Sequence, residues 1–500
     1  MHSHQSESPQ RSGETRLLRR PGARAAVCAA VAVLAGAALG SPAALSAPGG
    51  AATGDAQNFV VLAPQEASVN GAVQRVRATG GSVVARYDAI GVVIARSTRA
   101  DFASAVRGDG VQSAAATTGF GAPLRPEDTI EAAAPDPATT GEPLWSRQWD
   151  MRAIQVAEAH SVTTGSSDVV VGVLDSGIDA SHPDLASQVD AARSASCIGG
   201  VPDTSPAAWG PTTSDHGTHV AGTIAAARNG VGIVGVAPGV RLASVKVVND
   251  DGFIFPEAAV CGFMWAAAHG IDVTNNSYFI DPWEYNCRND VRQRPIWIAV
   301  QRAIRHASGQ GVLTVASAGN SNNDLAHKFI DDGSPNDGSA PPEERLINGA
   351  CVDLPAEAPG VVTVSATGPT GAKSFYSSYG LGVVEVAAPG GDSRQPGAEP
   401  NGRVFSTTWP GSGWGYKQGT SMAGPHAAGV AALIRSVHPE LSAGAVAAAL
   451  QRTADAQACP EGRAYDPTGD GAWAAFCRGS TQNNGFYGHG EVSAYRAVTG

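Results

Sequence analysis

Apolar runs alternate with amphipathic stretches along most of this 500-residue chain. Residues 169–174 form an almost uninterrupted apolar run, which is typical of a parallel strand covered on both faces. Further strands are expected at 241–247, 272–275, 312–316 and 361–365, and helices at 216–226, 256–269, 298–310, 425–437 and 442–452. This alternation predicts an α/β fold, a three-layer sandwich with a mostly parallel central sheet.

A smaller α/β pattern precedes this part of the chain. It predicts strands at 58–62, 82–87, 90–95 and 111–115, and helices at 68–79 and 100–106. Two β-α-β units in series predict a small ferredoxin-like domain over residues 54–118. The stretch 119–143 is rich in Ala, Pro, Thr and acidic residues, so we expect it to be an exposed linker.

The first 50 residues have the pattern of an export signal. Arg16, Arg19, Arg20 and Arg24 precede an uncharged run at 25–40 that is rich in Ala, Val and Leu. This run is shorter than the roughly 20 apolar residues that a membrane-spanning helix needs, and small residues follow it. We therefore expect residues 1–50 to be a secretory signal peptide rather than a membrane anchor, and the protein to be extracellular. Sec and twin-arginine export both remain open.

Composition narrows the class of protein further. Hydrophobic residues make up 43% of the chain, enough for a sizeable core, and the net charge is −11. This acidity argues against nucleic acid or an anionic membrane as partner. Of the seven cysteines, Cys28 falls within the signal, and the even number that remains indicates three disulfides with fifteen possible pairings.

Three short segments carry candidate chemistry. Asp175 follows the first buried strand in DSGID, His216 opens a helix in DHGTHVAG, and Ser421 lies in GTSMAGPH, where Pro425 is tolerable only in the first helical turn. Ligands of open α/β sheets bind beyond the carboxyl ends of strands, which is where Asp175 falls. Taken singly, each segment also suits a turn, a helix cap or an ordinary loop.

Together and in this order, the three motifs resemble those of the subtilisin-like serine peptidases. The resemblance covers residues 144–500 as a subtilisin-like peptidase domain, and the domain at 54–118 resembles the family's inhibitory propeptide. It implies a triad of Asp175, His216 and Ser421, with Asn320 of ASAGN as the second oxyanion donor. It also implies a secreted endopeptidase without a catalytic cofactor that acts on proteins or peptides. We expect a monomer that is made as a zymogen and cuts itself within 119–143.

The substrate-binding positions that the resemblance implies lie in two segments. They are Ser277, Tyr278, Phe279, Ala316, Ser317 and Gly319. Phe279 departs from the family's usual Ser-Leu-Gly, so we expect it to narrow or redirect the primary pocket. An acidic insert at 322–359 follows Asn320; it either walls one side of the cleft or is a plain surface loop, and its acidity suggests tolerance for basic peptide residues.

The resemblance also implies a structural calcium site. The side chains of Asp184, Asn229 and Gln148, with the carbonyl groups of Ala227, Val231 and Ile233, match the family's high-affinity site, an all-oxygen shell that Ca²⁺ prefers. For the disulfides, Cys459 and Cys477 bracket one loop, and Cys287 and Cys351 lie on insertions that flank the expected cleft. Cys197 would then pair with Cys261, on the exposed side of a helix if the family alignment holds.

Two other functions remain open. Phe279 and the long insert could restrict the cleft, which suits a dedicated maturation protease for one exported peptide precursor. The other function is that of an inactive secreted binding protein with the same fold, although the intact Asp175, His216, Ser421 and Asn320 argue against it.

Overall fold

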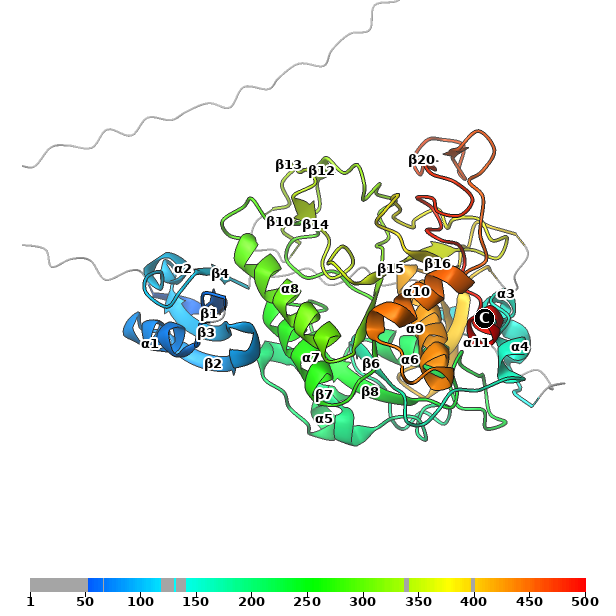
Figure 1. The fold of residues 1–500 in the computed structure, drawn as a ribbon, viewed down its shortest axis with the longest axis horizontal. Coiled ribbons are helices and arrows are strands. Elements are labelled where there is room, and N and C mark those ends of the chain that lie inside the picture. Colours follow the sequence, from blue (N-terminus) through cyan, green and yellow to red (C-terminus); the bar gives the residue numbers. More distant parts are fainter. Residues whose placement is uncertain (1–52, 66, 118–129, 132–140, 337–340, 397–400) are drawn as a thin grey trace, which may run out of the picture. The chain divides into compact units, whose positions relative to one another are not determined.

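The structure is a computed structural model that describes residues 53–65, 67–117, 130–131, 141–336, 341–396 and 401–500 (Figure 1). The predicted signal peptide and most of the predicted linker lie outside these residues. Within the described part of the chain, no helix is long and apolar enough to span a membrane.

The domain near the N-terminus has the predicted ferredoxin-like order of elements. They are β1 (Thr53–Leu62), α1 (Asn70–Ala78), β2 (Ser82–Tyr87), β3 (Val92–Arg99), α2 (Phe102–Ala105) and β4 (Ser113–Ala116). The strands form an antiparallel sheet in the order β2-β3-β1-β4. The third strand starts two residues later than predicted, because Gly91 adopts a left-handed conformation with φ of 64° after a short 3-10 turn.

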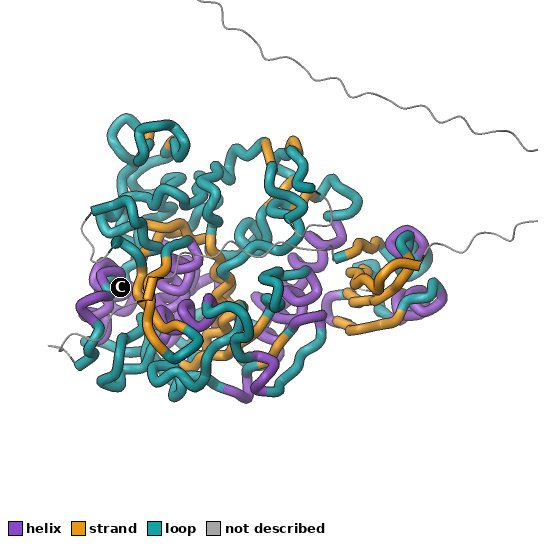
Figure 2. Tube along the Cα trace, turned by 180° about the vertical axis from the view of Figure 1, so that it is seen from behind, coloured by secondary structure: helices purple, strands orange, loops and turns teal. Residues whose placement is uncertain are grey.

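Seven parallel strands form the central sheet, in the order β16-β15-β11-β9-β6-β8-β7. They are β6 (Val170–Asp175), β7 (Ala195–Ser196), β8 (Arg241–Lys246), β9 (Val273–Asn276), β11 (Leu313–Ser317), β15 (Val362–Thr367) and β16 (Val386–Pro389). The predicted parallel α/β sandwich is thereby confirmed (Figures 1 and 2).

Helices cover both faces of this sheet. On one face lie α7 (Pro256–Ala268) and α8 (Arg294–Gly309), and on the other α6 (His216–Ala225), α9 (Thr420–Val437) and α10 (Ala443–Thr453). Side chains of β6 alternate between the two cores: Val171 and Val173 pack with α6 and α9, whereas Leu174 packs with α7 and α8. Burial on both faces explains why this strand is apolar throughout.

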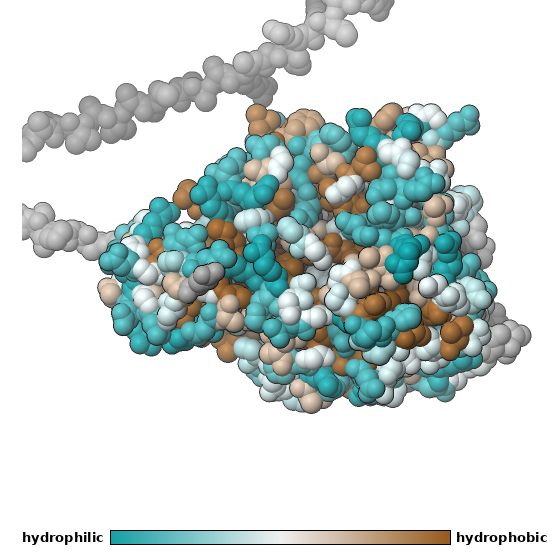
Figure 3. Space-filling view, in the orientation of Figure 1, coloured by the Kyte–Doolittle hydropathy of each residue, from teal (hydrophilic) through white to brown (hydrophobic). Residues whose placement is uncertain are grey.

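Shorter elements connect and flank the sandwich. The helices are α3 (Trp149–Ala153), α4 (Val156–His160), α5 (Pro206–Trp209) and α11 (Ala494–Thr499). The strands are β5 (Ile130–Glu131), β10 (Asn286–Cys287), β12 (Ile330–Asp331), β13 (Arg345–Leu346), β14 (Cys351–Val352), β17 (Val404–Thr408), β18 (Gly413–Lys417), β19 (Ala464–Tyr465) and β20 (Ala475–Phe476). Disulfides join Cys197 to Cys261, Cys287 to Cys351 and Cys459 to Cys477. On the face shown in Figure 3, hydrophilic side chains predominate and apolar ones lie among them.

Helix α9 corrects the expectation for Pro425. The helix begins at Thr420, so Pro425 lies inside it and not in its first turn. A proline nitrogen has no hydrogen to donate, and the carbonyl four residues earlier therefore loses its helical partner. That carbonyl belongs to Ser421, and the hydroxyl of Ser277 donates to it at 3.1 Å. A contact from the residue directly after β9 thus replaces the missing helical bond.

Candidate active site

Three chain segments meet at the carboxyl end of β6. Asp175 is the last residue of β6, His216 is the first residue of α6, and Ser421 is the second residue of α9. Gly217 allows α6 to lie close to the loop that follows β6, because a Cβ at this position would lie 2.5 Å from the carbonyl oxygen of Gly177. A side chain there would push His216 away from the end of β6.

The imidazole of His216 is bound to the carboxylate of Asp175. Nδ1 lies 2.8 Å from Oδ1 and 2.9 Å from Oδ2, and the backbone N–H of Ser176 donates to Oδ1 at 2.7 Å. Asp175 is 1% exposed, whereas the side chain of His216 is 15% exposed. Because Nδ1 faces an acceptor, it carries the proton in the neutral ring and leaves Nε2 as the basic nitrogen.

Ser421 is held at the start of a helix and is 6% exposed. Its Oγ lies 3.5 Å from the carbonyl oxygen of Ser277, at the limit of a hydrogen bond. The Nδ2 of Asn275 donates to the Ser277 hydroxyl at 2.9 Å, which in turn donates to the Ser421 carbonyl. These contacts fix the backbone that carries Oγ, and the helix dipole favours negative charge beside it.

The amide group of Asn320 is oriented by Thr420. Its Oδ1 accepts from the backbone N–H of Thr420 at 2.8 Å and from the Thr420 hydroxyl at 2.9 Å. The hydroxyl also accepts from the backbone N–H of Gly319 at 3.1 Å. With Oδ1 held in this way, Nδ2 is the group that remains to donate to a ligand. Sequence analysis did not single out Thr420, although it directly precedes Ser421 in the GTS motif.

The two expected substrate segments follow neighbouring parallel strands, β9 and β11. Ala316 and Ser317 are buried at the end of β11, and Gly319 follows them. Tyr278 is buried as well; its hydroxyl donates to Oδ1 of Asn276 at 3.0 Å, and burial raises the pKa of the phenol above its usual value. Phe279 is half-buried. Strand adjacency therefore brings segments 277–279 and 316–320 to the same edge of the sheet.

Two further histidines near the site have structural contacts. His426 is fully buried: its Nε2 lies 2.9 Å from Oδ2 of Asp150 and its Nδ1 lies 2.8 Å from the carbonyl oxygen of Met422. His219 is buried too, and burial, followed by the charge of Lys417, holds its pKa well below the usual value. His219 is therefore neutral and faces the carbonyl oxygen of Gly415.

The loop expected to bind calcium is closed by N–H donors. Oδ2 of Asp184 accepts from the indole N–H of Trp414 at 2.8 Å and from the backbone N–H of Ile233 at 3.0 Å. Oδ1 of Asn229 accepts from the backbone N–H of Val231 at 2.8 Å. Oε1 of Gln148 accepts from the N–H of Val234 at 3.1 Å.

These contacts leave part of a calcium shell in place. N–H groups face Oδ2 of Asp184, Oδ1 of Asn229 and Oε1 of Gln148, but Oδ1 of Asp184 is buried without a hydrogen-bond partner among the described residues, as an oxygen directed at a cation would be. Burial raises the pKa of Asp184 to about 6. Among the described residues, no three His, Cys, Asp or Glu side chains are grouped, but the expected calcium ligands include a single carboxylate and otherwise amide and carbonyl oxygens.

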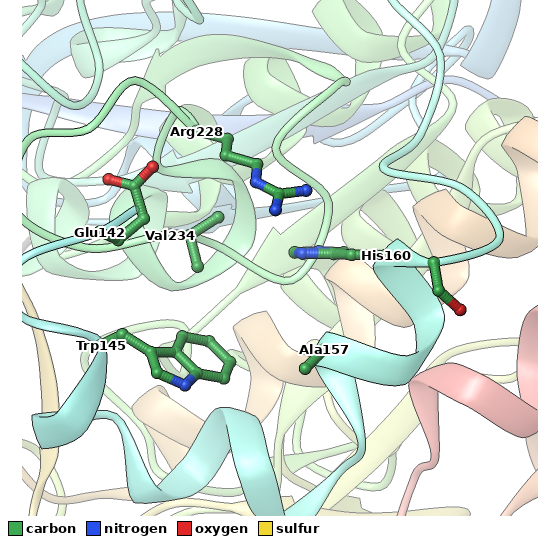
Figure 4. Close-up of a pocket in the computed structure, with 7 residues that line it drawn as sticks. Glu142, Trp145, Ala157, His160, Arg228 and Val234 are labelled. Carbon is green, nitrogen blue, oxygen red and sulfur yellow. The ribbon is translucent and has the colours of Figure 1, made fainter. Parts of the chain in front are cut away.

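A separate pocket of about 340 Å³ lies beside this loop (Figure 4). Glu142, Trp145, His160 and Arg228 line it, and Oε1 of Glu142 accepts from the backbone N–H of Gly230 at 3.0 Å. None of the residues at the ends of β6, α6 and α9 described above belongs to this lining.

Comparison with known proteins agrees with the geometry of the site. The subtilase family model matches residues 166–490. Fervidolysin from Fervidobacterium pennivorans is 31% identical over 331 residues, which is 63% of this chain and 41% of fervidolysin. Subtilisin DY from Bacillus licheniformis is 34% identical over 288 residues, 58% of this chain and 84% of that protein. This chain thus spans less than half of fervidolysin and most of subtilisin DY.

Solved structures show the same fold. The epidermin leader peptide processing serine protease from Staphylococcus aureus has a TM-score of 0.66 at 22% identity, covering 89% of this chain and 98% of that one. A protease from Pseudoalteromonas arctica has a TM-score of 0.52 at 29% identity, covering 72% of this chain and 99% of the other.

Proposed function

This chain belongs to the subtilase family of serine peptidases, and we propose that it cleaves peptide bonds through an acyl-enzyme formed on Ser421. One observation carries the proposal: Nδ1 of His216 contacts both carboxylate oxygens of Asp175, at the edge of the sheet where Ser421 starts α9. In the neutral ring this contact makes Nε2 the basic nitrogen, as the activation of a serine hydroxyl requires.

In the first step, Nε2 of His216 takes the proton of Ser421 while Oγ attacks the carbonyl carbon of the substrate. Asp175 keeps the ring in the required tautomer and stabilises the imidazolium that forms. The imidazolium then gives the proton to the leaving amine, so the peptide bond breaks and an ester on Ser421 remains. A water molecule, activated by His216 in the same way, hydrolyses the ester.

Negative charge develops on the substrate carbonyl oxygen during both attacks. Nδ2 of Asn320 and the backbone N–H of Ser421 are the proposed donors to it. The hydrogen bonds from Thr420 to Oδ1 orient this amide before the substrate arrives, so little reorganisation is needed in the transition state.

Labelling with a fluorophosphonate tests the proposed nucleophile. The reagent should modify the mature protein at one serine, and peptide mapping should locate the adduct on Ser421. An unlabelled, folded protein would favour the inactive binding protein instead.

We further propose that residues 54–118 are an inhibitory propeptide. Apolar residues of this domain, Val60, Leu62, Ile90, Val92 and Ile94, share one buried cluster with residues of α7 and α8. Arg302 of α8 adds polar contacts, since its guanidinium donates to the carbonyl oxygens of Ala63 and Ile90 at 3.2 Å. This contact supports a domain that stays bound to the peptidase domain and inhibits it. The chain would then be cleaved in the linker that follows this domain.

Glu257 makes the contact between the two domains dependent on pH. Oε1 accepts from Nδ2 of Asn58 at 2.8 Å, and burial raises the pKa of this carboxyl group above its usual value. A raised pKa means that the contact is strongest when Glu257 is protonated and weakens as the pH rises through the raised pKa. We therefore expect the cleaved propeptide to dissociate more readily at neutral than at acidic pH.

Gel filtration of the self-cleaved complex at a series of pH values would measure this release. Glu257→Gln should remove most of the pH dependence, whereas Glu158→Gln, at an exposed position on α4, should leave it unchanged. Equal pH dependence in wild type and Glu257→Gln would contradict the role of Glu257.

The predicted signal peptide and the three disulfides support export to the extracellular space, where disulfides persist. We propose that the protein acts there as a monomer. N-terminal sequencing of the secreted form would locate both processing sites.

We propose that the indole N–H of Trp414 and the backbone N–H of Ile233 hold Oδ2 of Asp184, and that its Oδ1 is left to bind a structural calcium ion. Removal of divalent cations with EDTA should then lower the Tm by at least about 2 °C, because an ion that binds only the folded protein stabilises it. Trp414→Phe should cost about 1–3 kcal/mol, because a buried carboxylate oxygen loses a donor. Thermal unfolding with and without EDTA measures both effects; a wild-type Tm that EDTA does not change would contradict the calcium ion.

The insert after Asn320 favours a second candidate, a dedicated maturation protease. A disulfide between Cys287 and Cys351 ties this insert to the segment that follows Phe279, beside the proposed substrate segments. The first solved structure above is that of a leader peptide processing serine protease. Rapid cleavage of casein and unrelated proteins would favour a general endopeptidase, whereas inertness toward them would favour the dedicated one.

A further inference from the structure

Three carboxylates gather beside the proposed substrate segments, and the catalytic steps use none of them. They are Glu284, Asp353 and Glu357, and we call them the acidic group. Glu284 precedes α8, while Asp353 and Glu357 lie at the end of the insert. Glu284 and Asp353 lie close in sequence to β10 and β14. These two strands pair with each other, and the Cys287–Cys351 disulfide joins them.

Asp353 lies between the two substrate segments. On one side, the carbonyl oxygen of its neighbour Leu354 accepts from the backbone N–H of Ile280 at 2.8 Å, directly after Phe279. On the other side, Oδ2 of Asp353 is 3.8 Å from the position that a Cβ on Gly319 would take. Gly319 directly precedes Asn320, the proposed oxyanion donor. The carboxylate is therefore aimed at the backbone against which the scissile carbonyl group would lie.

One oxygen of the Asp353 carboxylate is buried without a partner among the described residues. The residue is 5% exposed, and Oδ1 has no hydrogen-bond partner among the described residues. Burial, then the charges of Glu357 and Glu284, raise the pKa of this carboxyl group well above its usual value. A buried carboxylate of this kind is costly unless a cation or a set of donors compensates it.

The cations nearby are engaged by other groups. Lys328 forms an ion pair with Glu357 and donates to the carbonyl oxygen of Leu325 at 2.9 Å. Arg345 forms an ion pair with Asp331. Lys328 and Arg288 both act on Glu357, and none of the ion pairs between described residues includes Asp353, so this carboxyl group beside Gly319 has no cation bonded to it.

The acidic group is held in place by its own hydrogen bonds. The backbone N–H of Asp353 donates to Oε2 of Glu357 at 2.7 Å. Nδ2 of Asn323 donates to the hydroxyl of Tyr285 at 2.7 Å and to Oε1 of Glu284 at 3.2 Å. Glu284 and Glu357 are therefore held in place around Asp353.

We propose that Asp353 determines specificity by selecting substrates with arginine or lysine immediately before the scissile bond. This proposal rests on the proposed peptidase function. The side chain of that residue starts one bond from the carbonyl carbon that Ser421 attacks, so it begins next to Asn320 and Gly319. Arginine and lysine carry their charge at the end of a flexible stem, long enough to pass Gly319 and reach Asp353. A guanidinium or ammonium group would supply the missing cation and donors.

A divalent metal ion suits the acidic group less well. Among the described residues, no three His, Cys, Asp or Glu side chains converge closely enough to share one ion. A cationic substrate side chain needs only one carboxylate at its charged end and a favourable electrostatic potential around that carboxylate. Glu284 and Glu357 provide this potential.

The test compares four peptide amides that differ only in the residue before the scissile bond: arginine, citrulline, lysine or phenylalanine. Citrulline has the shape of arginine without its charge. With the self-processed wild-type enzyme, we expect kcat/KM for arginine to exceed that for citrulline and phenylalanine by at least about 50-fold. Asp353→Asn should lower the arginine-to-phenylalanine ratio by a similar factor. Glu344→Gln, at an exposed acidic position of the same insert, should leave the ratio unchanged.

Equal rates for arginine and citrulline, or a ratio that Asp353→Asn does not alter, would overturn the proposal. If Asp353→Asn does not fold, the comparison of arginine with citrulline in the wild type still decides. Failure of the peptidase function itself would look different, because no peptide would be cut and Ser421 would not be labelled by a fluorophosphonate.

Discussion

Replacing Ser421 with alanine is expected to lower kcat by about 10⁶-fold, the loss known for the nucleophilic serine of subtilisin. Without Oγ there is no acyl-enzyme, and the remaining oxyanion donors support only slow attack by water. The same variant should accumulate as an uncut precursor, because the proposed zymogen processing uses the same nucleophile. Immunoblots of the secreted protein would show the precursor, and peptide amide hydrolysis after trimming with trace wild-type enzyme would give kcat.

A matched control is Ser436→Ala, on the same helix but with its hydroxyl bonded to the carbonyl oxygen of Ala432 at 2.7 Å. It should mature and turn over like the wild type. Normal maturation of purified Ser421→Ala, with no other protease present, would show that another enzyme processes the zymogen.

Asn320→Ala should lower kcat by about 10²–10³-fold with little change in KM, a value known from the oxyanion asparagine of subtilisin. The loss falls on kcat because Nδ2 meets a full negative charge only in the transition state. Steady-state kinetics on one peptide amide would measure it. A large rise in KM at constant kcat would instead assign Asn320 to ground-state binding.

Asn320→Asp distinguishes the hydrogen bond that Nδ2 would donate to the oxyanion from the hydrogen bonds that Oδ1 accepts from Thr420. An aspartate keeps an oxygen that can accept from the N–H and hydroxyl of Thr420, so the local structure should survive, but it has no N–H for the oxyanion. We expect it to be at least as inactive as Asn320→Ala. Activity near the wild-type level in this variant would show that Nδ2 is not a donor.

The fold was predictable because its signals are local. Strand β6 is apolar at every position since helices cover both of its faces, and this appears as an unbroken run in the sequence. The motifs around Asp175, His216 and Ser421 each start or end an element, so their positions at one edge of the sheet followed from the order of strands and helices. The subtilase family was confirmed by a match over residues 166–490, a range that contains these three motifs.

Other features depend on contacts between segments far apart in the sequence. The start of α9 was predicted at Pro425 because a proline usually cannot continue a helix, whereas a hydroxyl from the residue directly after β9 compensates the lost bond. The expected calcium ligands Asp184, Asn229 and Gln148 have the right residue types, but an N–H group faces one oxygen of each, and of their oxygens only Oδ1 of Asp184 is buried without a partner among the described residues. A sequence pattern shows which oxygen atoms are present and not what is directed at them.

The sequence by itself thus determined the parallel α/β sandwich, the family and the residues expected to perform acyl transfer, because periodicity and short motifs encode them. Only the tertiary structure decided what lies around those residues. In the sequence, Asp353 is one of several acids in a long insert. The β10–β14 pair and its disulfide place it behind Gly319, where a buried carboxylate whose Oδ1 has no partner among the described residues favours a cation. The reason is physical: the surroundings of a charge are set by long-range packing, which no local pattern records.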